Sequence, residues 1–176
     1  MEHENDRQAL CETFRLIAGL FLTEPDVSIV KDLHDSMIIE SSASLDEISY
    51  DFENLFFDPV DRLLPYESFY SEFEGIIETP NSITESLYSA YLQEGLIMDE
   101  NMNISPDHIS AELYFISYLI ETSRLASLHQ FLDLHAVKWI PNFCDDLFEN
   151  AKTDFYRELA SITKDLVLNE YEELSS

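Results

Sequence analysis

Apolar side chains recur at helical spacing through most of the chain. A representative series is Leu10, Phe14, Ile17 and Phe21, in which each residue follows the last by three or four positions. Residues with this spacing share one face of an α-helix, so that the face can be buried as a stripe. Sustained apolar–polar alternation, which is typical of strands, is hard to find. The pattern predicts an all-α fold, a single-domain helical bundle.

Helix-start signals divide this pattern into segments. Ser44 with Glu47, and Ser82 with Glu85, have the spacing of capping boxes, in which two side chains bond free backbone N–H groups at a helix start. The predicted helices span residues 5–22, 26–39, 45–57, 82–94, 106–126, 128–136, 142–150 and 152–172.

Two long irregular stretches, at about residues 58–81 and 95–105, separate these helices. The first contains three prolines and a glycine, and we expect it to hold one short helix. The second ends at Ser105 and Pro106, which have the order of an N-cap and a first helical residue. Long loops within compact helical domains often carry function.

Length and composition limit the class of protein. A chain of 176 residues fits one domain, so we expect residues 1–176 to form one. There are only three glycines, and neither the dinucleotide-binding pattern nor the phosphate-loop pattern, both of which depend on glycine, is present. We therefore expect no cofactor.

The net charge of −27 limits the choice of partner. Nucleic acids and anionic membrane surfaces attract basic proteins, so we expect neither as a partner. The acidity suits a cationic peptide, but it equally suits a protein that is acidic for solubility or for a salty cytoplasm.

A reducing cytoplasm is the predicted location. Cys11 and Cys144 are too few for a disulfide framework. The acidic start of the chain does not resemble a secretory leader, and the apolar runs are too short to span a bilayer.

Acidic and histidine side chains gather at the start of the predicted helix 106–126. Asp107 lies near the positive end of the helix, where a carboxylate is favoured. The same field disfavours charge on His108, so we expect this histidine to be neutral. Glu112 follows one turn later on the same face. The simplest role for these groups is to hold the helix against the stretch 58–81.

Tyr66, Glu67 and Ser68 place an aromatic ring beside a carboxylate. The guanidinium of arginine can stack on such a ring and pair with such a carboxylate. The segment therefore suits an apolar peptide that carries arginine. We expect Phe69, by contrast, to fill the core beneath the loop.

Other kinds of chemistry have little support. The spacing of His108 and Glu112 is half of a metal site, but no second pair accompanies it, so we expect no metal. The same pair could serve as acid and base in a small helical enzyme, but no nucleophile is present and we expect no catalysis. Trp139 is predicted to be a buried anchor, and His129 and His135 to be hydrogen-bonded helix residues.

Three segments, taken together and in order, resemble the TorD/DmsD/NarJ family of maturation chaperones for molybdenum enzymes. They are residues 64–70 (LPYESFY), 105–113 (SPDHISAEL) and 135–143 (HAVKWIPNF). The resemblance covers roughly residues 10–145. The single tryptophan departs from relatives that place several around their peptide pocket.

The resemblance implies a cytosolic, all-helical chaperone that is not an enzyme. Its partner would be the N-terminal region, often a twin-arginine signal peptide, of a molybdopterin oxidoreductase precursor, held until cofactor insertion and before export. A monomer and a domain-swapped dimer are both compatible with the family. With Glu112 added from the helix-face reasoning, the expected peptide-binding residues are Tyr66, Glu67, Ser68, Pro106, Asp107, His108 and Glu112. The alternative is an acidic helical adaptor or regulatory protein without a molybdoenzyme client.

Overall fold

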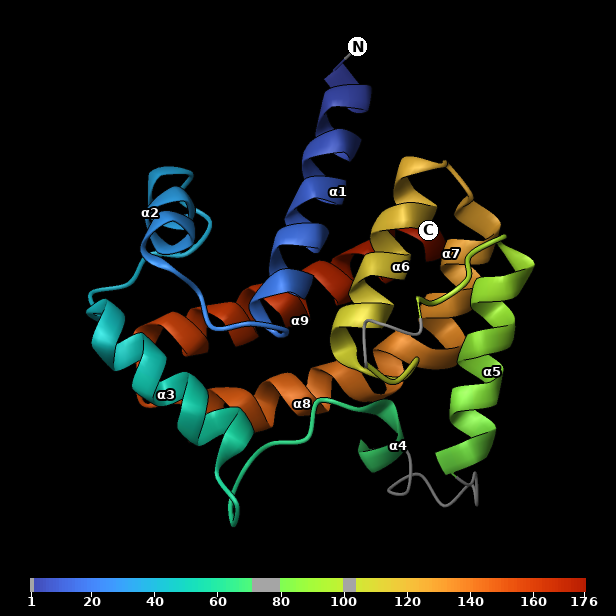
Figure 1. Cartoon of the computed structure of the whole chain (residues 1–176). Helices are drawn as coiled ribbons and strands as arrows, with labels where there is room; N and C mark the ends of the chain where they lie inside the picture. The colour runs from blue at the N-terminus through green and yellow to red at the C-terminus, as the bar shows by residue number, and fades with distance from the viewer. Residues whose placement is uncertain (1, 71–79, 100–103) are drawn as a thin grey trace.

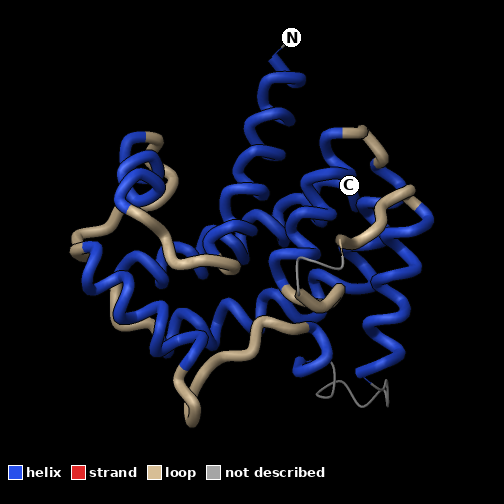
Figure 2. Tube along the Cα trace, viewed as in Figure 1, coloured by secondary structure: helices blue, strands red, loops and turns tan. Residues whose placement is uncertain are grey.

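A computed structural model of the chain describes residues 2–70, 80–99 and 104–176 (Figure 1). Its helices are α1 (Glu2–Leu20), α2 (Val27–Asp35), α3 (Leu45–Phe57), α4 (Glu67–Tyr70), α5 (Pro80–Gln93), α6 (Ile109–Glu121), α7 (Leu125–Phe131), the π-helical turn η3 (Leu132–Ala136), α8 (Val137–Asn150) and α9 (Asp154–Ser175). Helices make up most of the described residues, in which no strand occurs (Figure 2). The all-α prediction is confirmed. Of the described helices, none has the length and apolar character that a bilayer crossing requires.

The core lies where two helix pairs meet. α1 and α6 stand side by side above α8 and α9, which run antiparallel across the base (Figure 1). At the contact between α1 and α6, the Ser117 hydroxyl donates to the Cys11 carbonyl at 3.1 Å, and both side chains are fully buried. Small side chains let the two backbones approach, so α1 fixes the position of α6.

A buried carboxylate joins α3 to the turn between α8 and α9. Asp51 is 1% exposed, and its Oδ2 accepts hydrogen bonds from the backbone N–H groups of Lys152 and Thr153, at 3.0 and 2.7 Å. The Thr153 hydroxyl donates to the same oxygen at 2.7 Å. One side chain thus accepts three hydrogen bonds from the two residues that precede α9, and it attaches α3 to the start of that helix.

The helix-start predictions have mixed outcomes. The predicted helix 45–57 is present with those bounds, and the capping box of Ser44 and Glu47 is confirmed. The predicted N-cap at Ser82 is wrong, because α5 begins two residues earlier, at Pro80. Asp26 caps α2 by accepting from the Ile29 N–H at 2.9 Å. Residues 71–79, part of the predicted irregular stretch, and residues 100–103 lie outside the described residues.

Helix α8 begins before Pro141, whereas the sequence predicted a helix that starts after it. The segment from α7 through η3 to α8 is continuous, and Pro141 lies inside α8. A proline within a helix costs about 3 kcal/mol because it removes a hydrogen bond. The burial of Trp139, Ile140 and Phe143 on this helix offsets that cost, since each large apolar side chain contributes about 1.5–3 kcal/mol.

Replacing Asp51 by alanine should lower the free energy of unfolding by about 3 kcal/mol, because buried donors of the α8–α9 turn would lose a charged acceptor. Urea unfolding followed by circular dichroism measures this. The matched control is Glu53→Ala, which removes an exposed acid from the same helix and should change stability little. Equal stability of the two variants would contradict the role of Asp51.

Candidate functional site

The site is organised by a backbone pairing between two loop segments. Tyr66, just before α4, pairs with His108, just before α6, as an isolated antiparallel bridge. On either side of this pair, the N–H groups of Glu67 and Ile109 donate to carbonyls of the opposite segment, each at 2.9 Å. The segment 64–70 and the segment 105–113, which the sequence analysis singled out separately, are therefore in direct contact.

Because of this pairing, α6 begins later than the sequence predicted. The helix begins at Ile109, and His108 is its N-cap, with Nδ1 accepting from the Ser110 N–H at 3.1 Å. The predicted N-cap at Ser105 and first helical residue at Pro106 are wrong. The backbone before Ile109 bonds to the other segment, so it is not available for helical hydrogen bonds.

Asp107 holds the start of α4. Its side chain is 2% exposed, and Oδ2 accepts from the Ser68 N–H at 3.4 Å. Its Oδ1 accepts from the Ser105 hydroxyl. The neighbouring Pro106 carbonyl accepts from the Tyr91 hydroxyl at 2.7 Å, which ties the same segment to α5.

His108 is neutral at physiological pH, as the sequence predicted, but burial is the main cause. Desolvation lowers its pKa from 6.5 to about 4, and the negative charge of Asp107 opposes this only in part. Its ring packs edge-on against Tyr66, with ring centroids 5.0 Å apart. The imidazole therefore acts as a buried hydrogen-bonding and packing group.

Two further acids of the predicted site, Glu67 and Glu112, are also buried. Glu67 is 4% exposed, and its Oε2 lies 3.0 Å from His135 Nδ1. Glu112 is fully buried, and both of its oxygens lie 3.1 Å from Nε1 of Trp139, which donates to them. Trp139 is thus the buried anchor that the sequence predicted, and it also has a polar role.

The seven predicted site residues therefore form one continuous group, and solvent hardly reaches its acids in this conformation. His108 and Glu112 have separate partners, so the acid–base pair considered from the sequence is not formed. The prediction for Phe69 is wrong: it is 54% exposed. The neighbouring Tyr70 packs on the core, 5.8 Å from the ring of Trp139.

Sequence reasoning missed two members of the group. His135 was seen only as a helix histidine, although it lies in the third segment of the family resemblance and faces Glu67. Tyr91 gave no local signal, because its role depends on a contact with residue 106 in another segment. Within the described residues, no three His, Cys, Asp or Glu side chains are placed to hold a metal ion.

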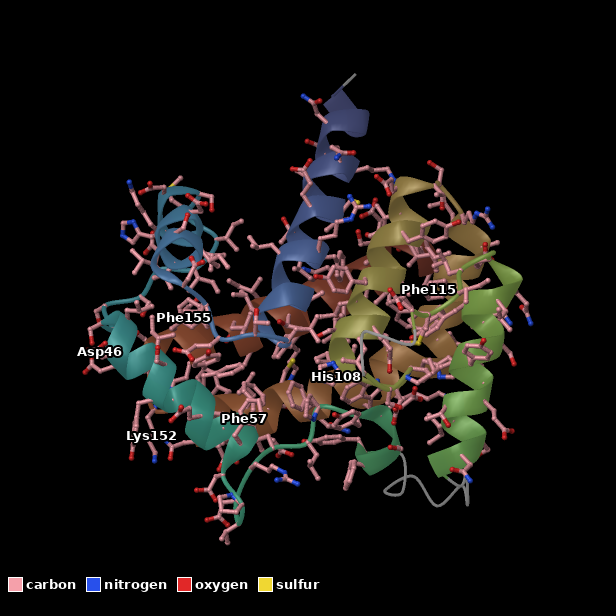
Figure 3. The ribbon with its side chains drawn as sticks, viewed as in Figure 1. Asp46, Phe57, His108, Phe115, Lys152 and Phe155 are labelled. Atoms are coloured by element: carbon pink, nitrogen blue, oxygen red, sulfur yellow. The ribbon has the colours of Figure 1, made fainter. Side chains whose placement is uncertain are left out.

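An apolar cavity of about 390 Å³ adjoins the group along α6. Ala111 and Phe115 of α6 and Tyr91 of α5 line it, and the ring centroids of Tyr91 and Phe115 lie 4.7 Å apart. In Figure 3, His108 lies at the lower end of α6 and Phe115 higher up, toward α5. The wall on the loop side consists of Leu96, Ile97, Met98, Asp99 and Ile104.

Comparison with known families agrees with this architecture. Residues 22–145, more than half of the chain, match the family described as nitrate reductase delta subunit. The chain belongs to this family, which is one of maturation chaperones for molybdoenzymes and not of catalysts. Chaperones of the family bind molybdoenzyme precursors. A search of curated proteins gave no match.

Replacing His108 by asparagine should remove one pH-dependent loss of stability. The folded-state pKa of His108, about 4, lies below the ordinary 6.5, so the wild type loses stability as pH falls from about 6.5 toward 4. Asparagine retains an N-cap acceptor but does not titrate in this range. Relative to the variant, the wild-type folding equilibrium constant should fall about tenfold per pH unit within that window. Urea unfolding at several pH values measures the difference, and a constant ratio would contradict a neutral buried His108.

Proposed function

We propose that this chain is a cytoplasmic chaperone that binds the N-terminal leader of a molybdopterin oxidoreductase precursor. The leader would be held until the cofactor has been inserted and before any export. The protein binds and releases a peptide and does not catalyse a reaction. Family membership supports the class of client, and the apolar cavity lined by Ile104 and by the α6 residues from Ala111 onward is the observation that supports peptide binding.

The cavity has the properties that an apolar peptide segment needs. Its volume of about 390 Å³ lies in the range typical of ligand pockets. Ile97, on its loop side, is 79% exposed, and an apolar side chain so exposed at a cavity is available to a partner. The apolar part of a leader would lie along α6, against Ala111 and Phe115.

The expected affinity is moderate. Burial of about 400 Å² of apolar surface contributes roughly 10 kcal/mol, whereas ordering a disordered peptide takes back about 2–5 kcal/mol. The net charge of −27 attracts the arginines of a twin-arginine leader, and Asp99 places a carboxylate at the cavity wall. Exposed ion pairs contribute under about 1 kcal/mol each, so charge mainly steers and selects the peptide. Such binding suits a chaperone that must release its client.

The buried acids hold the backbone of the site in place. Asp107 and Glu67 are too enclosed in this conformation to meet an arginine side chain, but they fix the segment that borders the cavity. We infer that Tyr66 and Pro106 supply contact surface, since both are only half-buried, and that Asp107, His108 and Glu112 hold that surface in place.

Replacing Ile97 by serine should weaken binding of a leader peptide several-fold, because it removes apolar area at the cavity. Isothermal calorimetry measures this with a synthetic peptide that carries an arginine pair followed by an apolar stretch. The matched control is Val60→Ser: Val60 is 82% exposed, much like Ile97, but does not line the cavity, so the affinity should not change.

The buried part of the site is tested by Asp107→Ala, which should weaken the same peptide at least several-fold while helix content is retained. If Ile97→Ser and Asp107→Ala both bind with wild-type affinity, the peptide binds elsewhere. If the wild type binds neither this peptide nor any oxidoreductase leader tested, the proposed function is wrong.

A further inference from the structure

Two buried carboxyl groups from different helices share one small region behind the candidate site. Glu67 comes from α4 and Glu112 from α6, and they are 4% and 0% exposed. Ionised carboxylates are costly to bury unless each has a compensating positive charge and hydrogen bonds. The question is which of the two carries a charge.

Their partners show that the two carboxyl groups are neighbours. Glu67 bonds His135, and Glu112 bonds Trp139. His135 and Trp139 are four residues apart on the continuous helix of η3 and α8, and so lie one turn apart on one face. The side chain of Glu67 also acts as a hydrogen-bonding partner of Glu112.

Among the described residues, the surroundings supply at most one positive charge for these two acids. The ionisable or polar groups around the pair, from each packed element, are Tyr91 of α5, Asp107 and His108 before α6, His135 of η3 and Trp139 of α8. His135 is paired with Glu67. His108 is neutral, and the indole of Trp139 is an uncharged donor. A second negative charge, on Glu112, would be unbalanced.

We propose that Glu112 is a positioning residue that carries a proton in the folded protein and shares it with Glu67, and that this shared proton keeps α4 attached to α5 and α8. A protonated Glu112 can donate to Glu67 while it accepts from Trp139. Burial first, and then the charge of Glu67, raise the pKa of Glu112 well above its ordinary value. Hydrogen bonding from Trp139 opposes this shift but does not reverse it.

The shared proton matters because α4 is short. It has four residues, and its described attachments to the core include the Glu67–His135 pair and the bonds from the N–H groups of Glu67 and Ser68 to Asp107. An ionised Glu112 would repel Glu67 and loosen this attachment. The protonation of a residue on α6 thus controls the placement of Tyr66 and of the segment that follows it.

The test compares the wild type with Glu112→Gln, an uncharged variant of the same shape as the protonated acid. The pKa of Glu112 is higher in the folded than in the unfolded chain, so its contribution is full below about pH 4.5 and is lost as pH rises toward the folded-state pKa. From about pH 5 upward, as far as the folded-state pKa, the wild-type folding equilibrium constant should therefore fall about tenfold per pH unit relative to the variant, as measured by urea unfolding. A ratio that does not change with pH would overturn the proposal.

Infrared spectroscopy of the wild type provides a second test if Glu112→Gln fails to fold. At neutral pH, the native protein should show the carbonyl stretch of a buried protonated carboxylic acid. The matched control is Glu170→Gln, which removes another buried glutamate with a raised pKa, on α9. The band should persist in this control and, where Glu112→Gln folds, disappear in that variant. Its absence from the wild type, or its loss in the control, would overturn the proposal.

The link to ligand binding rests on the proposed function and is measured separately. Glu170→Gln, on α9, should bind the leader peptide within about twofold of the wild type, because this glutamate lies outside the site. Glu67→Gln should bind it several-fold more weakly, because the pair with His135 is lost. Equal binding by both variants would remove the positioning role. If the wild type binds no leader, the proposed function fails, while the stability and infrared tests still decide where the proton lies.

Discussion

The structure of the site depends on one requirement: two loop segments without helical hydrogen bonds must satisfy their backbone groups. The two segments form backbone hydrogen bonds with each other, at the bridge between Tyr66 and His108. Because of this pairing, α4 follows directly from one segment and α6 from the other, with their starts held together. The cavity lies along α6, which contributes Ala111 and Phe115 to its lining.

The acids of this chain divide into two groups with different physical roles. Most are exposed and give the molecule its strong negative field, which acts at a distance on cationic partners. A few, such as Asp51, Glu67, Asp107 and Glu112, are buried, where each organises donors from another part of the chain. Composition predicts the first group. Only the folded structure distinguishes the second from it.

The helices could be predicted from the sequence because apolar spacing is a local signal, and the bounds of α3 follow from its capping box. The start of α6 could not, because the groups that compete for its first hydrogen bonds lie about forty residues away. Pro141 was misleading for a similar reason: its local cost is outweighed by the burial of side chains around Trp139. The family resemblance predicted most of the candidate site residues, and helix spacing added Glu112, but the three-dimensional contacts were needed to separate half-buried residues such as Tyr66 from buried ones such as Asp107.

The π-helical turn at Leu132–Ala136 has a consequence for the comparison of related sequences. It accommodates one residue more than an α-helix of the same length would. If the same residues continued as a regular α-helix, α7 would be rotated by about 100° relative to α8. The faces of Phe131 and Trp139 would then no longer be in phase. The π-helical turn absorbs the extra residue and so keeps the two faces in phase. A homologue with a one-residue deletion here would keep the same phase through a regular α-helix, so a single gap at this turn is compatible with the same packing.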